Sequence, residues 1–236
     1  MTLRRLNGSS VTGSWLVVVR GCRVAGGKVR GLVQWLPNPP DGTEVVLGFD
    51  GALTGSADCT ALRAETLDGF QFTPRYGPDA RPTIWVPAEW GGEYDRSEVH
   101  AAVDEVFYRY KVKRMYCDPF WWETEIGDWA QEYGDEVVME WRTNRPQAMF
   151  ESISRFEIDL RNGRITHDGC PITAEHVGNA VKKNRKVQIY LLDKPEEHQK
   201  IDAAMTSILA HEAWADAVTD GWREDTETDN RLFHFR

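Results

Sequence analysis

The chain has 236 residues, of which 41% are hydrophobic and 11% aromatic, and its formal net charge is −9. This length and composition suit one α/β domain with a full core and exclude a disordered chain. The negative charge excludes binding to nucleic acid through overall charge, so any such contact depends on a local basic patch, and we expect the isolated domain to bind DNA weakly.

Four cysteines lie far apart and form no C-x-x-C pair; they are Cys22, Cys59, Cys117 and Cys170. This spacing argues against a zinc site or a disulfide framework and is typical of reduced thiols. The apolar run at residues 14–22 is too short to span a membrane, and no A-x-A cleavage site follows it. We therefore expect a cytoplasmic protein that is not secreted and has no contact with a membrane.

Three segments differ in composition along the chain. Residues 1–43 are rich in glycine and arginine and end in the turn sequence PNPPDG, so we predict an N-terminal extension of uncertain structure. Residues 44–218 carry a regular pattern of strands and helices and are predicted to form the folded domain. Residues 219–236 are polar and are predicted to be a C-terminal tail.

The first half of the domain begins with a predicted β-hairpin. Residues 45–50 are an apolar run typical of a buried strand, and residues 58–69 alternate enough to be its partner. The elements predicted next are a strand at 81–90, a helix at 97–113 capped by Ser97, a strand at 114–119, a helix at 123–134 and a strand at 136–142. This order predicts an α/β fold with a mixed sheet and crossover helices on its faces.

The second half is predicted to be mainly helical. Amphipathic patterns indicate helices at 145–163, 173–184 and 197–218, with a strand or extended segment at 186–194.

Three aspartates are distinguished by their positions in these elements. Asp50 ends the first strand, Asp118 ends the strand after the first crossover helix, and Asp202 lies in the first turns of the last helix. Each alone is more often structural, because aspartate favours turns, strand exits and helix starts. On neighbouring strands, however, adjacent carboxylates raise a pKa or require a counterion. Mg²⁺ or Mn²⁺ would provide that counterion, because these ions prefer carboxylate oxygen and water.

Five segments in order resemble the nuclease domain of the large terminase subunit of tailed bacteriophages, which belongs to the ribonuclease H-like superfamily. They are VVLGFDGALTGSADCTAL, YCDPFWWETEIGDWAQEYG, VVMEWRTNRPQAM, HDGCPITAEHVGNAVKK and KIDAAMTSILAHEA, between Glu44 and about Ala217. The resemblance implies a ribonuclease H-like mixed β-sheet flanked by helices. It also implies that Asp50, Asp118 and Asp202 bind two Mg²⁺ or Mn²⁺ ions and are the catalytic residues.

By the same resemblance, we expect an endonuclease that cuts concatemeric double-stranded viral DNA during genome packaging by a two-metal mechanism. The implied partners are a terminase ATPase domain or subunit, the small terminase subunit and the portal, in the cytoplasm of a bacterial host. The motifs of the ATPase motor are absent from the sequence. We therefore expect an excised domain, a split gene product or a nuclease with a separate motor, and expect the isolated domain to be monomeric.

Further residues are candidates for contact with DNA or for support of the metal ligands. The candidate DNA contacts are Lys182, Lys183, Arg185, Lys186, Lys200, Arg142 and Arg145, which could bind phosphate or simply lie at solvated element ends. The candidate supporting residues are His176, Asn179 and Glu123. Gly51 and Gly55 are expected to turn the first hairpin away and leave room for a phosphate.

Two other functions remain open. A non-catalytic DNA-packaging adaptor or clamp could keep the same fold, although it has no need of three aspartates. An actin-like sugar kinase also begins with a strand ending in FDG, but that fold requires two such domains and a second phosphate loop.

Overall fold

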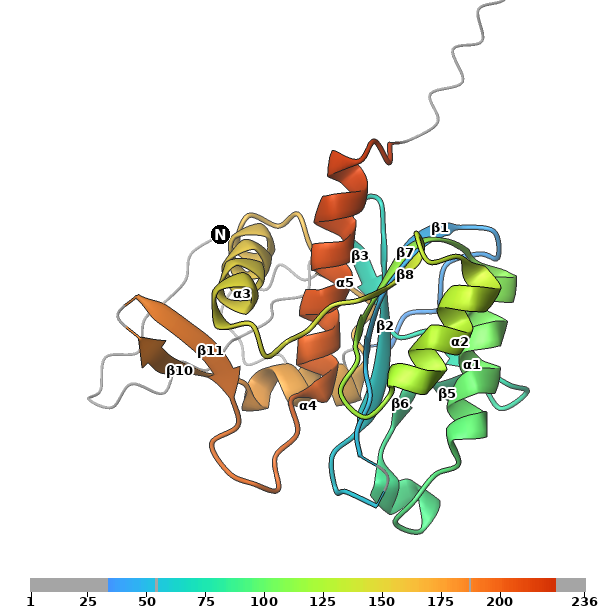
Figure 1. The fold of residues 1–236 in the computed structure, drawn as a ribbon, viewed down its shortest axis with the longest axis horizontal. Helices are drawn as coiled ribbons and strands as arrows, with labels where there is room; N and C mark the ends of the chain where they lie inside the picture. The colour runs from blue at the N-terminus through green and yellow to red at the C-terminus, as the bar shows by residue number, and fades with distance from the viewer. Residues whose placement is uncertain (1–33, 54, 187, 224–236) are drawn as a thin grey trace, which may run out of the picture.

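The computed structural model describes residues 34–53, 55–186 and 188–223. Within them, the central sheet has the strand order β8-β7-β1-β2-β3-β9 (Figure 1). Its middle strands are β1 (Glu44–Asp50), β2 (Thr60–Thr66) and β7 (Lys111–Asp118). Strand β1 pairs antiparallel with β2 and parallel with β7, which confirms the predicted hairpin and the mixed sheet.

Short strands complete the sheet on both sides. Strand β8 (Val138–Glu140) pairs parallel with β7 at one edge. At the other edge, β3 (Phe70–Phe72) pairs antiparallel with β2 and parallel with β9 (Thr166–His167).

The predicted strand at 81–90 is wrong in its extent. The segment contains β5 (Arg81–Pro82), which pairs with β4 (Arg75–Tyr76), then β6 (Ile84–Trp85), which pairs with β2, and then the 3₁₀ helix η1 (Pro87–Trp90). The prolines account for the interruption, because they cannot donate a hydrogen bond to a strand ladder.

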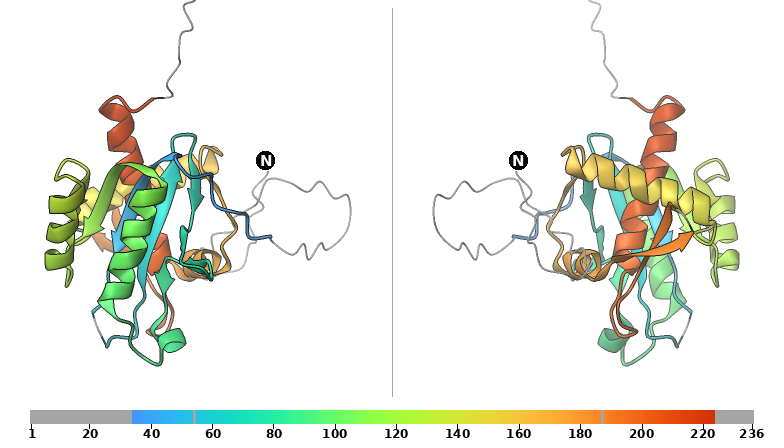
Figure 2. Two further views of the ribbon diagram at one scale, coloured as in Figure 1. Left: turned by 90° about the vertical axis from the view of Figure 1, so that its right-hand side faces the viewer. Right: turned by 90° about the vertical axis from the view of Figure 1, so that its left-hand side faces the viewer.

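Helices cover both faces of the sheet (Figure 1). Helices α1 (Arg96–Arg109) and α2 (Glu123–Tyr133) pack on one face. On the other face lies α5 (Asp202–Thr219), which contacts α3 (Pro146–Arg161) and α4 (Pro171–Asn179). Figure 2 shows α3 crossing α5 at a steep angle, so α5 is enclosed between the sheet and α3.

Two predicted helices run too far toward the C-terminus. The helix predicted at 97–113 ends at Arg109, because Lys111 already pairs with Glu44 as the first residue of β7. Its cap is Asp95, whose carboxylate accepts the Ser97 backbone N–H, rather than Ser97 itself.

The helix predicted at 173–184 ends at Asn179. The chain then forms the hairpin of β10 (Val181–Lys186) and β11 (Ile189–Asp193). The helix predicted at 197–218 begins only at Asp202.

Alternation along β1 decides which face carries the acid at its end. Val45 and Leu47 pack toward α1 and α2, whereas Val46 packs toward α3 and α5. Because side chains alternate along a strand, Gly48 and Asp50 lie on the same face as Val46. A Cβ at Gly48 would lie 2.3 Å from the backbone oxygen of Thr206 in α5, so only glycine allows α5 to approach β1 this closely.

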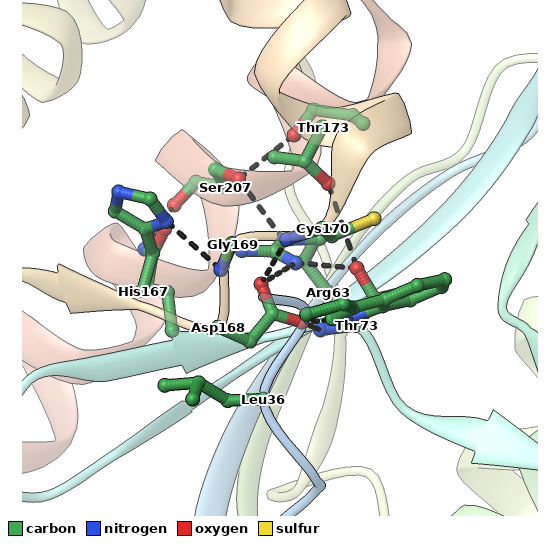
Figure 3. A network of polar contacts seen from close by, with 12 residues as sticks. Leu36, Arg63, Thr73, His167, Asp168, Gly169, Cys170, Thr173 and Ser207 are labelled. Atoms are coloured by element: carbon green, nitrogen blue, oxygen red, sulfur yellow. Dashed lines mark hydrogen bonds and ion pairs between the residues drawn. The ribbon is translucent and has the colours of Figure 1, made fainter. Parts of the chain in front are cut away.

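A buried polar network fixes α4 and α5 against β2 (Figure 3). Arg63, in β2, donates to the Ser207 hydroxyl in α5 over 3.2 Å and lies 3.5 Å from Asp168, with which it forms an ion pair. Asp168 also accepts the Cys170 backbone N–H at the start of α4 over 3.0 Å, and the Trp35 indole N–H over 3.0 Å. The network therefore holds the start of α4 beside α5.

The described cysteines Cys59, Cys117 and Cys170 are buried free thiols, and Cys22 lies outside the described residues. Among the described helices, none combines the length and apolar character that crossing a membrane requires. Residues 1–33 of the predicted extension (1–43) and residues 224–236 of the predicted tail (219–236) also lie outside the described residues.

Candidate metal centre

Three aspartates lie near one another where the middle strands β1 and β7 end. Asp50 and Asp118 are direct partners in the parallel register of β1 and β7, and neighbouring strands lie about 4.8 Å apart. Asp118 follows Tyr116 by two residues, and Tyr116 packs toward α5, so both carboxylates lie on the α5 face. Asp202 is the first residue of α5, which packs against β1 and β7.

The charges in this group oppose one another. Burial raises the pKa of Asp50 well above its ordinary value, and the negative charges of Asp202, Asp118 and Asp58 raise it further. Burial also raises the pKa of Asp202 to about 6, and Asp58 contributes to that shift. A nearby cation would relieve the repulsion and favour the ionised carboxylates.

Carboxylate oxygens are the type of donor that suits a hard divalent cation. Oδ2 of Asp202 is buried and accepts no hydrogen bond from the described residues, so it is free to bind a ligand. Oδ2 of Asp118 accepts the Thr143 hydroxyl, which orients that carboxylate. Mg²⁺ and Mn²⁺ prefer carboxylate oxygens and water, and Asp50, Asp118 and Asp202 present such oxygens. These three residues could therefore hold a metal ion.

Helix α4 positions the start of α5. Ile201, the N-cap of α5, provides no side-chain cap. His176 Nδ1 instead accepts the backbone N–H of Ala203 over 3.0 Å, and Asn179 Nδ2 donates to the backbone oxygen of Lys200 over 3.0 Å. His176 and Asn179, two of the three predicted supporting residues, therefore bind the backbone on either side of Asp202.

Among the described residues, the group of three or more possible metal ligands whose donor atoms all lie within 4.8 Å of one another is Cys59, His176 and Asp202, and the three aspartates are more widely spaced than this. Burial raises the pKa of the Cys59 thiol to about 12 and lowers the pKa of His176 to about 4. Because Nδ1 of the neutral ring accepts a hydrogen bond, its proton is on Nε2, so neither nitrogen is free to bind a metal. Mg²⁺ and Mn²⁺ prefer carboxylate oxygen to sulfur, so the three aspartates remain the candidate ligands for a hard cation.

The predicted basic run lies on the β10–β11 hairpin rather than at a helix end. Lys182 forms an ion pair with Glu157 over 2.6 Å, and Lys183 with Asp193 over 2.6 Å. Arg185 lies 3.7 Å from Asp193, and the Lys186 side chain lies outside the described part of the structure. These pairs partly neutralise the basic run.

The remaining predicted residues follow β8 or begin α2. Arg142 and Arg145 flank Thr143, the partner of Asp118, and are exposed beside this end of β7. Glu123 is exposed at the first position of α2, and the described structure shows no hydrogen bond or ion pair from its side chain to the three aspartates. A carboxylate at a helix start interacts favourably with the helix dipole, which explains Glu123 without a metal.

Sequence reasoning missed Asp58, which contributes to this region. Asp58 lies close enough to raise the pKa of Asp50 and Asp202, and it binds both Lys194 and Lys200. The one sequence feature that could have indicated Asp58 is its position just before β2, the strand that pairs with β1.

Gly51 has a packing role that the sequence did not suggest. A Cβ there would lie 2.2 Å from the Trp122 indole nitrogen, and that nitrogen donates to the backbone oxygen of Ala52 over 2.9 Å. Gly51 therefore makes room for the Trp122 side chain.

The chain has the architecture of the ribonuclease H-like class of α/β proteins. Its mixed sheet has helices on both faces, and three acids lie near the ends of the middle strands β1 and β7. Residues 79–217 match the family model described as terminase large subunit, endonuclease domain, and the chain belongs to this family. The matched segment includes Asp118 and Asp202 and begins after Asp50.

Two curated relatives are the Gene 13 proteins of Mycobacterium phages D29 and L5. Over 187 residues, the chain is 32% identical to the D29 protein and 30% identical to the L5 protein. In both cases the match covers 74% of this chain and 30% of the relative. The chain thus spans about a third of the length of these relatives.

Solved structures share the fold. The large terminase nuclease from thermophilic phage G20c has a TM-score of 0.58 and 12% identity, over 77% of this chain and 92% of that chain. The same nuclease with bound magnesium has a TM-score of 0.54 and 13% identity, over 77% of this chain and 91% of that chain. The large terminase of bacteriophage HK97 has a TM-score of 0.52 and 20% identity, over 78% of this chain and 41% of that chain. The predicted ribonuclease H-like fold is confirmed.

Proposed function

We propose that the chain is a metal-dependent endonuclease that cleaves concatemeric double-stranded viral DNA during genome packaging. The observation that carries the proposal is the meeting of Asp50, Asp118 and Asp202 on one face, with a buried, unpaired oxygen on Asp202. Membership of the terminase endonuclease family supports this chemistry. The G20c nuclease with bound magnesium supports a divalent cation, and we propose two Mg²⁺ or Mn²⁺ ions.

In this proposal the three aspartates hold the ions and the neighbouring residues fix the aspartates. Bound ions would activate a water molecule and stabilise the leaving oxygen of a phosphodiester. Thr143 orients Asp118 by donating to one of its oxygens, which leaves the other oxygen for a ligand. His176 holds the first turn of α5 and, as a neutral ring, adds no charge beside Asp202.

The proposed setting is the cytoplasm of an infected bacterium. The curated relatives are about three times as long as the matched segment, so we propose that this domain works with a terminase ATPase domain or subunit. The small terminase subunit and the portal are the further partners proposed, by family membership.

Incubation with supercoiled plasmid tests the proposal. We expect nicked and linear products with Mn²⁺ or Mg²⁺ and none with chelator, because the aspartates alone cannot activate water. Restoring the metal after chelation should restore cleavage. A plasmid that stays intact with every metal, although the protein is folded, would instead favour the packaging adaptor. Cleavage that persists in chelator would exclude the metal mechanism.

We expect His176→Leu to reduce cleavage about 10- to 100-fold, as is typical when a residue that supports a metal ligand is lost. The substitution leaves the Ala203 N–H without its acceptor, so the first turn of α5 and Asp202 are no longer held. The Mn²⁺ concentration for half-maximal cleavage should rise. His167→Leu is the matched control, because His167 Nδ1 accepts the Gly169 N–H over 3.0 Å in the same way, on β9. Equal effects of the two substitutions on metal dependence would contradict a positioning role for His176.

A further inference from the structure

Asp58 links the loop that follows Asp50 to the loop that precedes Asp202, and both of these aspartates are catalytic in the proposed function. It lies between β1 and β2, in the loop that follows Asp50. Its Oδ1 atom accepts hydrogen bonds from Lys194 Nζ over 2.9 Å and from Lys200 Nζ over 2.8 Å. Both lysines lie between β11 and α5, in the loop that leads to Asp202. Two ammonium groups thus meet on one carboxylate oxygen beside the metal centre.

The two lysines keep Asp58 negatively charged close to Asp50 and Asp202, where its charge makes ionisation of those two acids less favourable. Burial alone would raise the pKa of Asp58, but the hydrogen bonds from Lys200 and Lys194 outweigh burial and hold it below its usual value. Asp58 therefore stays ionised, and its charge raises the pKa of both Asp50 and Asp202. The two lysines carry two positive charges against the single negative charge of Asp58, and both also lie within electrostatic range of Asp202.

The lysines are better placed to bind phosphate than the basic run on the β10–β11 hairpin. Lys200 is 17% exposed and Lys194 is 27% exposed. Both lie close to Asp202, because the charge of Lys200 lowers the pKa of Asp202 and the charge of Asp202 raises the pKa of Lys194. The backbone of Lys200 is also anchored by the side chain of Asn179. Asp58, at 47% exposed, is the most accessible member of the group, so an incoming anion can reach and replace it.

We propose that Lys194 and Lys200 form a phosphate clamp, and that the Asp58 carboxylate occupies the position of a DNA backbone phosphate until DNA replaces it. This inference rests on the proposed function, because it takes DNA as the substrate. Lysine ammonium groups bind phosphate oxygens as point charges, much as they bind the carboxylate oxygen here. Partly exposed ion pairs contribute little to stability, so the exchange of carboxylate for phosphate is easy. Asp58 thereby competes with DNA.

The test measures binding of a fluorescent DNA duplex to the full chain in chelator, where no cleavage occurs. Asp58→Asn should bind about fivefold more tightly than the wild type, the effect of removing one partly exposed competing pair. Asp58→Glu keeps the charge and should bind like the wild type. The matched control is Asp41→Asn, which also removes an acid from an ion pair, with Arg109 over 2.9 Å, three residues before β1 begins. It should change affinity little.

Replacing both lysines by methionine tests the clamp directly. The Lys194→Met, Lys200→Met protein should bind DNA more weakly, and Asp58→Asn should give no gain in that background. The slope of log affinity against log salt should become shallower by about 1.8, because two ammonium groups no longer neutralise backbone phosphates. Thermal melting of each variant verifies folding.

Three results would overturn the inference: equal affinities for Asp58→Asn and Asp41→Asn, an unchanged salt slope in the lysine variant, or a higher Mn²⁺ requirement for cleavage in Asp58→Asn. The last would make Asp58 a metal ligand. Since binding is measured without metal, a protein that binds in the expected pattern but never nicks plasmid would refute the nuclease and leave the clamp standing.

Discussion

Replacing Asp202 with asparagine is expected to abolish metal-dependent cleavage and, at the same time, to stabilise the metal-free protein. Loss of about 4 kcal/mol of transition-state stabilisation by bound metal corresponds to about a 1000-fold lower rate. The stability should rise because burial and neighbouring charge raise the pKa of Asp202 to about 6, so its ionised form is unfavourable at neutral pH. The asparagine amide can also donate a hydrogen bond to a neighbouring carboxylate.

Plasmid nicking with Mn²⁺ and thermal melting in chelator measure the two effects. Each kcal/mol of relieved repulsion should raise Tm by about 2–4 °C for a domain of this size, and Mn²⁺ should stabilise the variant less than the wild type. Asp216→Asn is the matched control on the same helix, where the carboxylate accepts the Tyr116 hydroxyl over 2.6 Å. It should leave cleavage unchanged. Full activity of Asp202→Asn would refute the assignment of the metal centre.

Replacing His211 with glutamine is expected to destabilise the protein by about 3–5 kcal/mol at or below pH 6.5, the cost of breaking a buried charge pair. His211 lies between two buried carboxylates, 2.9 Å from Glu65 Oε1 and 3.1 Å from Asp159 Oδ2. Arg164 also pairs with Asp159 over 2.6 Å, and Gln71 donates to Glu65 over 2.8 Å. Glutamine cannot replace the positive charge that both acids face.

The loss of stability should depend on pH. Burial alone would lower the pKa of His211, but the hydrogen bonds and charges of Glu65 and Asp159 outweigh it and raise the pKa above 6.5. A raised histidine pKa contributes stability that is fully present below pH 6.5 and is lost as the pH rises through the folded-state value. The gap in unfolding free energy between wild type and His211→Gln should therefore narrow as pH rises.

Urea unfolding at several pH values measures this gap. His198→Gln is the control, because His198 is 77% exposed and pairs only with Glu196 among the described residues. That variant should follow the wild type at every pH. A gap for His211→Gln that stays constant or widens between pH 6 and pH 9 would show that His211 is not held in its charged form.

Some boundaries could not be predicted from local pattern. The helical periodicity of α1 continues past Arg109 without a glycine or proline, yet Lys111 joins β7 because it pairs with Glu44 on β1. Lysine and arginine at 182–186 favour a helix locally, but the segment forms β10 because it pairs with β11. In both cases, pairing with another strand (β1 for Lys111, β11 for β10) overrides the intrinsic preference for a helix.

The sequence by itself determined the carboxylates at the strand ends. An apolar run that ends on Asp50 and another strand that ends on Asp118 are local patterns that can be read from the sequence, whereas their pairing as neighbours is a finding of the structure. The parallel register, in which Asp50 is the direct partner of Asp118, puts both acids on one face. Resemblance in five ordered segments added the family, which residues 79–217 confirm.

Only the tertiary structure decided what surrounds those acids. The docking of α5 at Gly48 brings Asp202 to the sheet, and α4 brings His176 to the first turn of α5. The pairing of Asp58 with Lys194 joins residues that are 136 positions apart in the chain. Local pattern cannot encode such contacts, because they depend on how closely whole helices and loops pack once the sheet has formed.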